Sequence, residues 1–239
     1  MKTILGILLL AIVSATNAIA QDALQNDLAL KYLAHLPSEK SEHPPVVILL
    51  HGYGSDEKDL FGLSSFFPKN YLIISARAPY PLQGGGYEWY EMIDIKGQRD
   101  GDPSQLANSM DLVKKFIPQV IAKYKADSRR AYLMGFSQGG MMSYRVGLTA
   151  PSMVRGIGVL SGTIYPSLKP MIKVTPTLKQ LRVFIAHGKT DNRISFEDGK
   201  RAYDYLTGIG LAPEFHSYEG MGHTISKEVL TDLVNWLKR

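Results

Sequence analysis

Cysteine is absent from this chain of 239 residues. The absence excludes disulfide bonds, zinc sites built from thiolates and a thiol nucleophile. In an oxidising compartment the protein must therefore be stabilised by packing alone. The sequence also lacks a His-x-x-x-His pair, an acidic cluster with metal-ligand spacing and a Gly-rich phosphate loop. We therefore expect neither a bound metal nor a cofactor.

A hydrophobic run long enough to span a membrane is missing as well. The apolar stretch Ile4–Val13 is shorter than the about 20 residues that a bilayer requires. It follows the positive Lys2 and precedes residues 18–20, Ala-Ile-Ala, which fit an A-x-A cleavage site. No cysteine follows, which disfavours a lipid anchor. We expect a secretory signal peptide at 1–20, one α/β domain at 21–239, and an exported protein, periplasmic or secreted, without stable membrane insertion.

Charge is only mildly biased toward one sign. The chain holds 27 Lys and Arg against 22 Asp and Glu, a formal net charge of +5. The basic residues are scattered, as at Lys114-Lys115 and Arg129-Arg130, and no stripe of aromatic residues lies between them. This pattern indicates a solvated basic surface rather than a nucleic-acid partner. No heptad or apolar stripe fixes an assembly, so both a monomer and a homodimer stay open.

Strand and helix patterns alternate along the chain, which predicts a mostly parallel sheet covered by helices on both faces. Strands are expected at 29–36, 46–50, 72–74, 130–134, 156–160, 181–186 and 213–218. Helices are expected from Pro103 towards Tyr124, over 197–206 and over 226–237, with Asp102 as cap and Pro118 kinking or splitting the first. A loop at 79–91 is rich in glycine and aromatics, and 163–179, with three prolines, is expected to form a mobile excursion.

The most informative segment places a serine between a predicted strand and a predicted helix. Ser137 lies between Gly135 and Gly139 in the pattern G-x-S-x-G. A serine at such a sharp turn is strained and exposed above the sheet edge, and glycines two positions away let the strand and helix cross closely. The pattern occurs by chance on its own. Its interpretation as a nucleophile elbow depends on finding the partners of the serine.

A serine nucleophile needs a histidine base, which in this topology follows the last strand. Three of the six histidines lie in predicted strands or in a loop remote from the catalytic edge: His35, His216 and His43. Two more end strands near the right edge but precede at least one required element: His51 and His187. His223 stands in a loop after the last strand and before the closing helix. We predict that His223 is the catalytic base, rather than a helix-capping or surface histidine.

The triad acid should follow the strand at 181–186. Asp191 ends the loop after that strand, whereas Glu197 and Asp198 fall inside the next predicted helix, where a solvated face explains them. The oxyanion needs two backbone N–H donors. Gln138, directly after the nucleophile, supplies one, and the loop His-Gly-Tyr-Gly at 51–54 supplies the other, with Tyr53 as the expected donor.

These motifs resemble the phospholipase/carboxylesterase family of α/β-hydrolases, which includes bacterial carboxylesterases and acyl-protein thioesterases. The resemblance rests on residues 50–54, on Gly-Phe-Ser-Gln-Gly-Gly at 135–140, on 160–162, on 187–188 with Asp191, and on 222–223. It implies an α/β-hydrolase fold, a triad of Ser137, Asp191 and His223, and oxyanion donors Tyr53 and Gln138. It also implies that Trp89 lies near an acyl pocket.

Two departures from the family pattern bear on the substrate. The family segment Trp-Phe-Asp reads Trp89-Tyr90-Glu91 here, and the thioesterase branch has an acidic residue directly after His-Gly-x-Gly where this chain has Ser55. Export also fits poorly with removing acyl groups from cytosolic proteins. These differences favour a general carboxylesterase over a protein thioesterase.

The predicted function is a serine carboxylesterase that hydrolyses short- to medium-chain acyl or aryl esters, small-molecule substrates, through an acyl-enzyme. Two alternatives stay open. An exported ligand-binding protein on a hydrolase scaffold would use Trp89 and Tyr90 as a stacking platform and substrate-binding surface. An esterase, thioesterase or lysophospholipase with a narrow natural substrate would keep the same chemistry.

Overall fold

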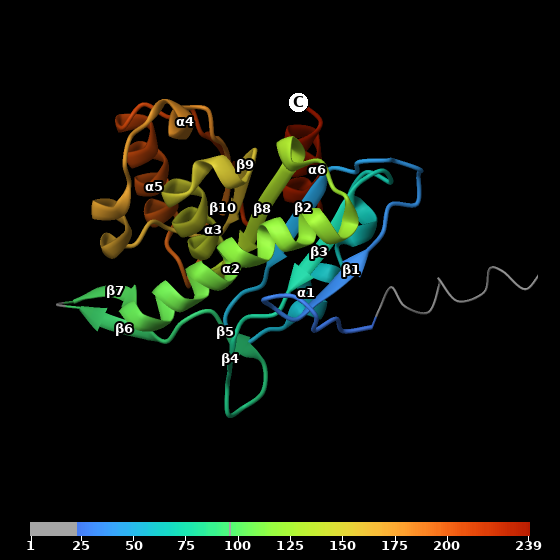
Figure 1. Cartoon of the computed structure of the whole chain (residues 1–239). Helices are drawn as coiled ribbons and strands as arrows, with labels where there is room; N and C mark the ends of the chain where they lie inside the picture. Colours follow the sequence, from blue (N-terminus) through green and yellow to red (C-terminus); the bar gives the residue numbers. More distant parts are fainter. Residues whose placement is uncertain (1–22, 96) are drawn as a thin grey trace, which may run out of the picture.

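A twisted sheet of seven strands forms the centre of the computed structural model, which describes residues 23–95 and 97–239 (Figure 1). The strand order is β1-β3-β2-β8-β9-β10-β11, parallel throughout except for β1, which runs antiparallel to β3. The strands are β1 (Tyr32–His35), β2 (Val46–Leu50), β3 (Leu72–Ala76), β8 (Ala131–Phe136), β9 (Gly156–Leu160), β10 (Arg182–Gly188) and β11 (Glu214–Tyr218). The predicted mostly parallel α/β sheet is confirmed. The predicted signal peptide at 1–20 lies outside the described residues.

Helices cover both faces of the sheet because successive strand residues point to opposite sides. On one face, residues such as Ile48 and Leu133 pack with helices α2 (Pro103–Tyr124), α3 (Gln138–Thr149) and α5 (Phe196–Gly208). On the other, Leu49 and Met134 pack with α1 (Glu57–Phe61) and α6 (Lys227–Leu237). Short turns η1 (Ser64–Phe66), η2 (Ser128–Arg130) and η3 (Pro151–Met153) complete the connections. The sheet therefore has a buried hydrophobic core on each of its two faces.

The parallel register aligns the carboxyl ends of the central strands along one edge. Leu50, the last residue of β2, lies opposite Gly135 of β8, and Gly135 lies opposite Val159 of β9. Ala186 of β10 lies opposite Leu160. Ligands of open α/β sheets bind outside the carboxyl ends of the strands. The loops after β2, β8, β10 and β11 are therefore where a site is expected.

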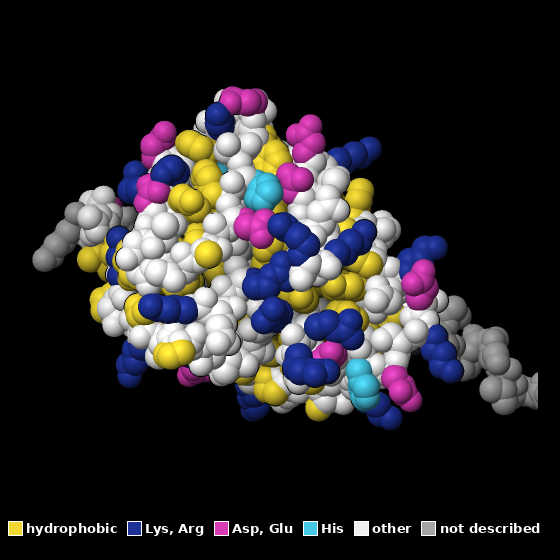
Figure 2. Space-filling view, turned by 90° about the horizontal axis from the view of Figure 1, so that it is seen from above, with side chains coloured by type: hydrophobic (Ala, Val, Ile, Leu, Met, Phe, Trp, Pro, Cys, Tyr) yellow, Lys and Arg dark blue, Asp and Glu magenta, His cyan; other side chains and the backbone are white. Residues whose placement is uncertain are grey.

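The opposite edge, formed by the amino ends of the same strands, carries basic side chains. Arg130 and Arg155 directly precede β8 and β9, and Arg182 begins β10. Figure 2 looks onto the top of Figure 1, where the C-terminus and α4 lie, and shows Lys and Arg side chains gathered in the middle of this face. Part of this charge is paired, since Asp127 accepts from Arg130 at 2.8 Å.

The first long helix corrects part of one prediction, that Pro118 splits it. α2 begins as expected, with the Asp102 carboxylate accepting a hydrogen bond from the Gln105 N–H at 2.9 Å. It is not split at Pro118, however, and continues without a break to Tyr124 (Figure 1). Val113 and Val120, on either side of the proline, are fully buried against the core. This packing holds both halves of the helix on the sheet despite the missing N–H.

Two further segments are more regular than the sequence suggests. Residues 163–179, predicted as an excursion, fold into η4 (Pro166–Met171) and α4 (Pro176–Lys179), which bury Leu168 and Leu178. The segment 80–101 holds two antiparallel pairs, β4 (Tyr80–Pro81) with β5 (Tyr87–Glu88) and β6 (Met92–Ile95) with β7 (Gln98–Gly101). Among the described residues, no helix combines the length and apolar character needed to cross a bilayer.

Candidate active site

Ser137 sits at a tight turn between β8 and α3, in a backbone conformation that side chains rarely adopt. Its φ is 53° and its ψ −117°, and its N–H donates to the Leu160 carbonyl at 2.8 Å. The flanking glycines are required by space. A Cβ on Gly135 would lie 2.1 Å from the Gly139 carbonyl carbon, and one on Gly139 would lie 2.0 Å from the Leu50 oxygen. The turn therefore has the geometry of a nucleophile elbow.

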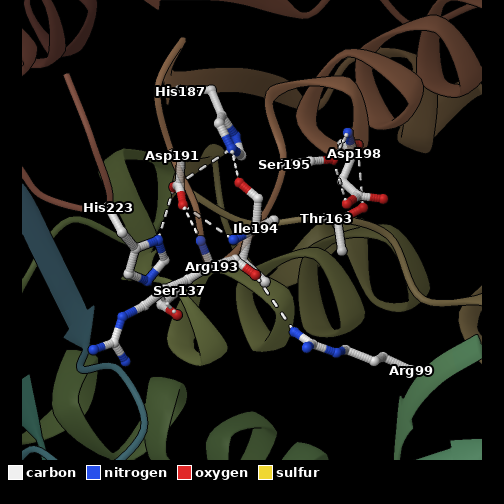
Figure 3. Close-up of polar contacts among 10 residues, drawn as sticks. All are labelled: Arg99, Ser137, Thr163, His187, Asp191, Arg193, Ile194, Ser195, Asp198 and His223. Atoms are coloured by element: carbon white, nitrogen blue, oxygen red, sulfur yellow. Dashed lines mark hydrogen bonds and ion pairs between the residues drawn. The ribbon is translucent and has the colours of Figure 1, made fainter. Parts of the chain in front are cut away.

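The three residues predicted as a triad meet in one hydrogen-bonded chain (Figure 3). His223 Nε2 lies 2.9 Å from Ser137 Oγ, and His223 Nδ1 lies 2.7 Å from Asp191 Oδ2. An ionised carboxylate only accepts, so Nδ1 carries the proton and Nε2 is free to accept from the hydroxyl. The His223 side chain is 10% exposed, while that of Asp191 is fully buried. The chain thus holds an imidazole against the hydroxyl and shields the carboxylate from solvent.

Asp191 is held ionised by its own loop. Its second oxygen, Oδ1, accepts the backbone N–H groups of Arg193 at 2.9 Å and Ile194 at 3.0 Å. Burial by itself raises the pKa of Asp191, but the hydrogen bonds from His223 and from these two amides outweigh it and lower the pKa below its usual value. The carboxylate is therefore available to orient and stabilise a protonated His223.

His187, which the sequence analysis sets aside as the base, lies behind the acid. It is fully buried, with Nε2 2.9 Å from the Ile194 carbonyl and 3.6 Å from Asp191 Oδ2 (Figure 3). A Cβ on Gly199 would come within 2.3 Å of its ring, so α5 packs directly on this histidine. His187 fixes the loop that presents Asp191. The His-Gly pair at the end of β10 is the sequence signal for this supporting role.

The loop after β2 passes beside the nucleophile. A Cβ on Gly52 would lie 3.5 Å from Ser137 Cβ. Across the described part of the chain, no acceptor is paired with the backbone N–H of Tyr53 or of Gln138, while the Tyr53 side chain is exposed. Two unpaired amides near a serine hydroxyl are what an oxyanion hole requires. His51, buried at the start of this loop, accepts the Ala78 N–H at 3.0 Å, and its burial lowers its pKa.

Trp89 and Tyr90 correct the predicted stacking platform. Both side chains have no exposed surface, so neither ring offers a face to a ligand. They lie beneath the site instead. The Trp89 indole donates to the His51 carbonyl at 2.9 Å, the Trp89 N–H donates to Gln138 Oε1 at 2.7 Å, and Gln138 Nε2 donates to the Tyr90 carbonyl at 2.7 Å. This segment therefore ties the loop after β2 to the start of α3.

A buried ion pair that no sequence pattern indicated supports the same loop. Glu57, fully buried in α1, accepts from Arg77 after β3, with Arg77 Nη2 2.7 Å from Glu57 Oε1. Arg77 also donates to the Tyr87 hydroxyl at 3.0 Å. The Tyr87 backbone in turn accepts the Gly54 N–H at 3.0 Å and donates to the Ser55 carbonyl at 2.8 Å. The ion pair thus reaches the turn that carries Tyr53.

Two cavities open beside the triad. The smaller, of about 220 Å³, reaches His223 and is lined mainly by the apolar side chains Leu60, Leu63, Phe136 and Ile225. The larger, of about 810 Å³, reaches Asp191 and lies between the β6–β7 hairpin, η4 and α5. The cavity that reaches His223 is therefore small and mostly apolar, and the one that reaches Asp191 is wide and polar.

Comparison with known proteins defines the class. The fold matches a carboxylesterase from Mesorhizobium loti with a TM-score of 0.79 and 22% identity, covering 91% of this chain and 99% of that one, which makes the fold an α/β-hydrolase fold. Among curated proteins, acyl-protein thioesterase 1 of Gibberella zeae is 34% identical over 83% of this chain and 92% of its own length. A probable carboxylesterase, SOBER1-like, of Arabidopsis thaliana is 29% identical over 81% and 78%.

The sequence profile of the phospholipase/carboxylesterase family matches residues 33–239. The chain belongs to this family of ester-bond hydrolases, as its motifs predict. The matched range begins within β1 and includes every strand and loop that contributes to the site described above.

Proposed function

We propose that this protein is a serine carboxylesterase that hydrolyses short- to medium-chain acyl or aryl esters through an acyl-enzyme intermediate. The observation that carries the proposal is the continuous chain from Ser137 Oγ through His223 to Asp191, with contacts of 2.9 and 2.7 Å. A hydroxyl becomes an effective nucleophile when a base takes its proton and a third group orients that base. Membership of an ester-hydrolase family supports the same chemistry.

In the proposed reaction, His223 Nε2 takes the proton of Ser137 as Oγ attacks the ester carbonyl carbon. The carbonyl electrons move to oxygen, and the N–H groups of Tyr53 and Gln138 stabilise the resulting oxyanion. The imidazolium then protonates the leaving alcohol as the tetrahedral intermediate collapses to the acyl-enzyme. Water, deprotonated by His223, repeats the sequence and releases the carboxylic acid. Asp191 holds the required tautomer and stabilises the imidazolium throughout.

The proposed acyl size rests on the smaller cavity. Its volume of about 220 Å³ is below the about 300–1,000 Å³ of typical ligand pockets. Leu60, Leu63 and Ile225 make its lining mostly apolar, with Asp59 as its one carboxylate, so it suits a hydrocarbon acyl group rather than an anionic one. We therefore assign this cavity to the acyl chain and expect turnover to fall once the chain outgrows it.

Hydrolysis of p-nitrophenyl esters of increasing acyl length tests the proposal, with Ser137→Ala beside the parent protein. Removing a triad serine is expected to lower kcat by at least about 10⁴-fold. Ser143→Ala is a matched control, since Ser143 is buried in α3 and donates to the Gly139 carbonyl rather than to His223. Substantial turnover by Ser137→Ala would refute the serine mechanism.

A thioesterase remains the second candidate because an acyl-protein thioesterase is among the similar proteins. Thioester hydrolysis would use the same groups, with a thiol as leaving group. Measuring kcat/KM for an oxygen ester and a thioester of the same acyl group separates the two. The binding-protein alternative is weakened because Trp89 and Tyr90 are buried.

We further propose that the protein is exported, periplasmic or secreted, because residues 1–20 have the pattern of a signal peptide. Fractionation of the producing cells followed by N-terminal sequencing tests this. A mature chain beginning at Gln21 outside the cytoplasm is expected. We also propose that the protein is a monomer or a homodimer. Light scattering of the purified protein gives its mass in solution.

A further inference from the structure

The larger cavity carries an unusual set of charges. Four cationic side chains and two carboxylates are among the residues that line this cavity of about 810 Å³. The cations come from separate parts of the chain, namely β7, η4, the loop after β10 and α5: Arg99, Lys169, Arg193 and Arg201. All four are exposed at its rim. Distant segments have thus been brought together around one basic opening.

The two carboxylates are too few to balance the four cations, so the lining carries a net positive charge. Asp198 accepts from Ser195 Oγ at 2.7 Å and pairs with Arg201, so these two charges cancel locally. Asp191 is buried and directs its oxygens at His223 and at two backbone amides. Within residues 23–95 and 97–239, no carboxylate forms an ion pair with the three other cations, Arg99, Lys169 and Arg193.

These cations are attached to well-anchored backbone. Arg99 donates to the Arg193 carbonyl at 3.4 Å, which links β7 to the triad loop (Figure 3). Next to Arg99, the Asp100 carboxylate accepts from the Ser167 N–H at 3.0 Å and hydroxyl at 2.8 Å, which joins β7 to η4. Arg193 is two residues from Asp191, and Figure 3 shows its side chain extending to the side of the view on which Ser137 and His223 lie.

We propose that this cavity binds an anionic group of the substrate, so that the enzyme acts on esters that carry a carboxylate, phosphate or sulfate. Arg99 and Arg193, whose side chains lie on opposite sides of the loop after β10 in Figure 3, are two separate candidate donors, because a guanidinium group binds such oxyanions through paired hydrogen bonds. The cavity shares no lining residue with the apolar acyl cavity, and on that ground we assign the charged group to the alcohol side of the ester. The inference rests on the proposed esterase function and adds the substrate class to it.

A general basic surface would attract anions without a site, and the amino edge of the sheet provides the comparison. Arg155 is exposed there, directly before β9, and is outside both cavities. Arg155→Gln changes the net charge by the same amount as Arg99→Gln or Arg193→Gln. It therefore reports any effect of overall charge alone.

The test compares kcat/KM for 4-acetoxybenzoate and its neutral methyl ester, which share the acetyl group and differ in a charge on the alcohol side. The parent protein is expected to prefer the anionic ester. Arg193→Gln and Arg99→Gln are each expected to lower the ratio of the two kcat/KM values by about tenfold, the usual scale for a charge-assisted hydrogen bond. Arg155→Gln should leave the ratio unchanged. Raising ionic strength from about 0.01 M to about 1 M should lower the ratio through screening.

A second pair locates the charge: 4-nitrophenyl hydrogen glutarate and 4-nitrophenyl pentanoate carry it or lack it on the acyl side. Preference for glutarate alone would overturn the alcohol-side assignment. Equal kcat/KM within both pairs, or an equal effect of Arg155→Gln, would overturn the proposal while leaving the esterase function intact. Calorimetric binding of 4-acetoxybenzoate to Ser137→Ala, with and without Arg193→Gln, tests the anion site even if no ester is turned over. Equal affinity in the two variants would refute it.

Discussion

Asp191 and Arg193 stand two residues apart in the loop after β10, but the protein holds them in opposite ways. The Asp191 side chain is fully buried and accepts three hydrogen bonds. The Arg193 side chain is instead exposed at the rim of a cavity and has no carboxylate partner among the described residues. The position of the acid is thus set by packing and backbone, and that of the guanidinium mainly by its own rotamers. A carboxylate held in this way is coupled to the fold, whereas a side chain at the rim can be substituted at little cost in stability.

The same contrast separates the two ends of the site. The Ser137 turn needs glycines that no other residue can replace without a clash. The loop at 51–54, called the oxyanion loop because it carries the proposed donor Tyr53, is held by hydrogen bonds that involve Trp89, Gln138 and Tyr87. The basic cavity is formed by the β6–β7 hairpin, η4, the loop after β10 and α5, and its cationic side chains are exposed. We therefore expect substitutions in the first region to change kcat or stability, and substitutions in the second to change the choice of substrate.

The largest effect is expected from Asp191→Asn, which removes the charge but keeps the size of the side chain. The amide can no longer hold His223 in the right tautomer or stabilise its cation, so kcat should fall by about 10⁴-fold, equivalent to about 5 kcal/mol. Steady-state hydrolysis of a p-nitrophenyl ester measures it. Asp198→Asn is the control from the same region, because Asp198 pairs with Arg201 and does not contact His223. Equal losses in the two variants would contradict the assignment of the acid.

A smaller but still severe effect is expected from Gly139→Ala. The added methyl group would lie 2.0 Å from the Leu50 oxygen and 2.6 Å from the His51 oxygen, both of them backbone atoms that cannot turn away. Forcing such a group into a packed core costs about 3 kcal/mol or more, so the variant should be strongly destabilised or fail to fold. The midpoint of urea denaturation measures the change in the free energy of unfolding.

Gly208→Ala provides the matched control, because a Cβ there meets nothing within 4 Å and the residue ends α5. Its unfolding free energy should stay the same or rise by up to about 1 kcal/mol, since alanine restricts the unfolded chain. Similar midpoints for the two variants would show that the close crossing of β8 and α3 is not needed for stability.

The juxtaposition of Ser137, Asp191 and His223 could be predicted from the sequence because local signals mark it. Gly135 and Gly139 frame the nucleophile, and Asp191 and His223 each follow a strand at the edge that the parallel topology defines. Such signals arise where backbone geometry restricts the residue type. In the folded chain the three side chains are connected by hydrogen bonds, and their catalytic role stays a prediction.

The surrounding features escaped prediction because they depend on contacts between distant residues. Glu57 and Arg77 are 20 residues apart, and no local pattern indicates that they pair. Trp89 and Tyr90 follow a glycine-rich turn, which suggested exposure, but their burial depends on α2, α3 and η4 folding over them. Likewise, continuous packing on both sides of Pro118 overrides its tendency to break a helix.

The smallest of these effects is expected where the two regions meet, at the buried ion pair behind the oxyanion loop. In Glu57→Gln, Arg77 loses a charged acceptor and is left partly buried, which costs about 1–3 kcal/mol of unfolding free energy at neutral pH. Burial alone raises the pKa of Glu57, but the hydrogen bonds from Arg77 outweigh it and lower the pKa below 4.5. The ionised carboxylate therefore stabilises the folded state above the unfolded pKa, and this stability is lost as the pH falls through the folded pKa.

Because a protonated Glu57 and a glutamine are both neutral, the difference between the parent and Glu57→Gln should be largest at neutral pH and shrink below about pH 4.5. Urea denaturation of both proteins across this range gives the two curves. Glu88→Gln is the control, since burial raises the pKa of Glu88 and reverses the sign of its contribution. A difference that stays constant with pH would mean that the side chain at 57 acts through packing rather than charge, and that the oxyanion loop does not depend on the ion pair.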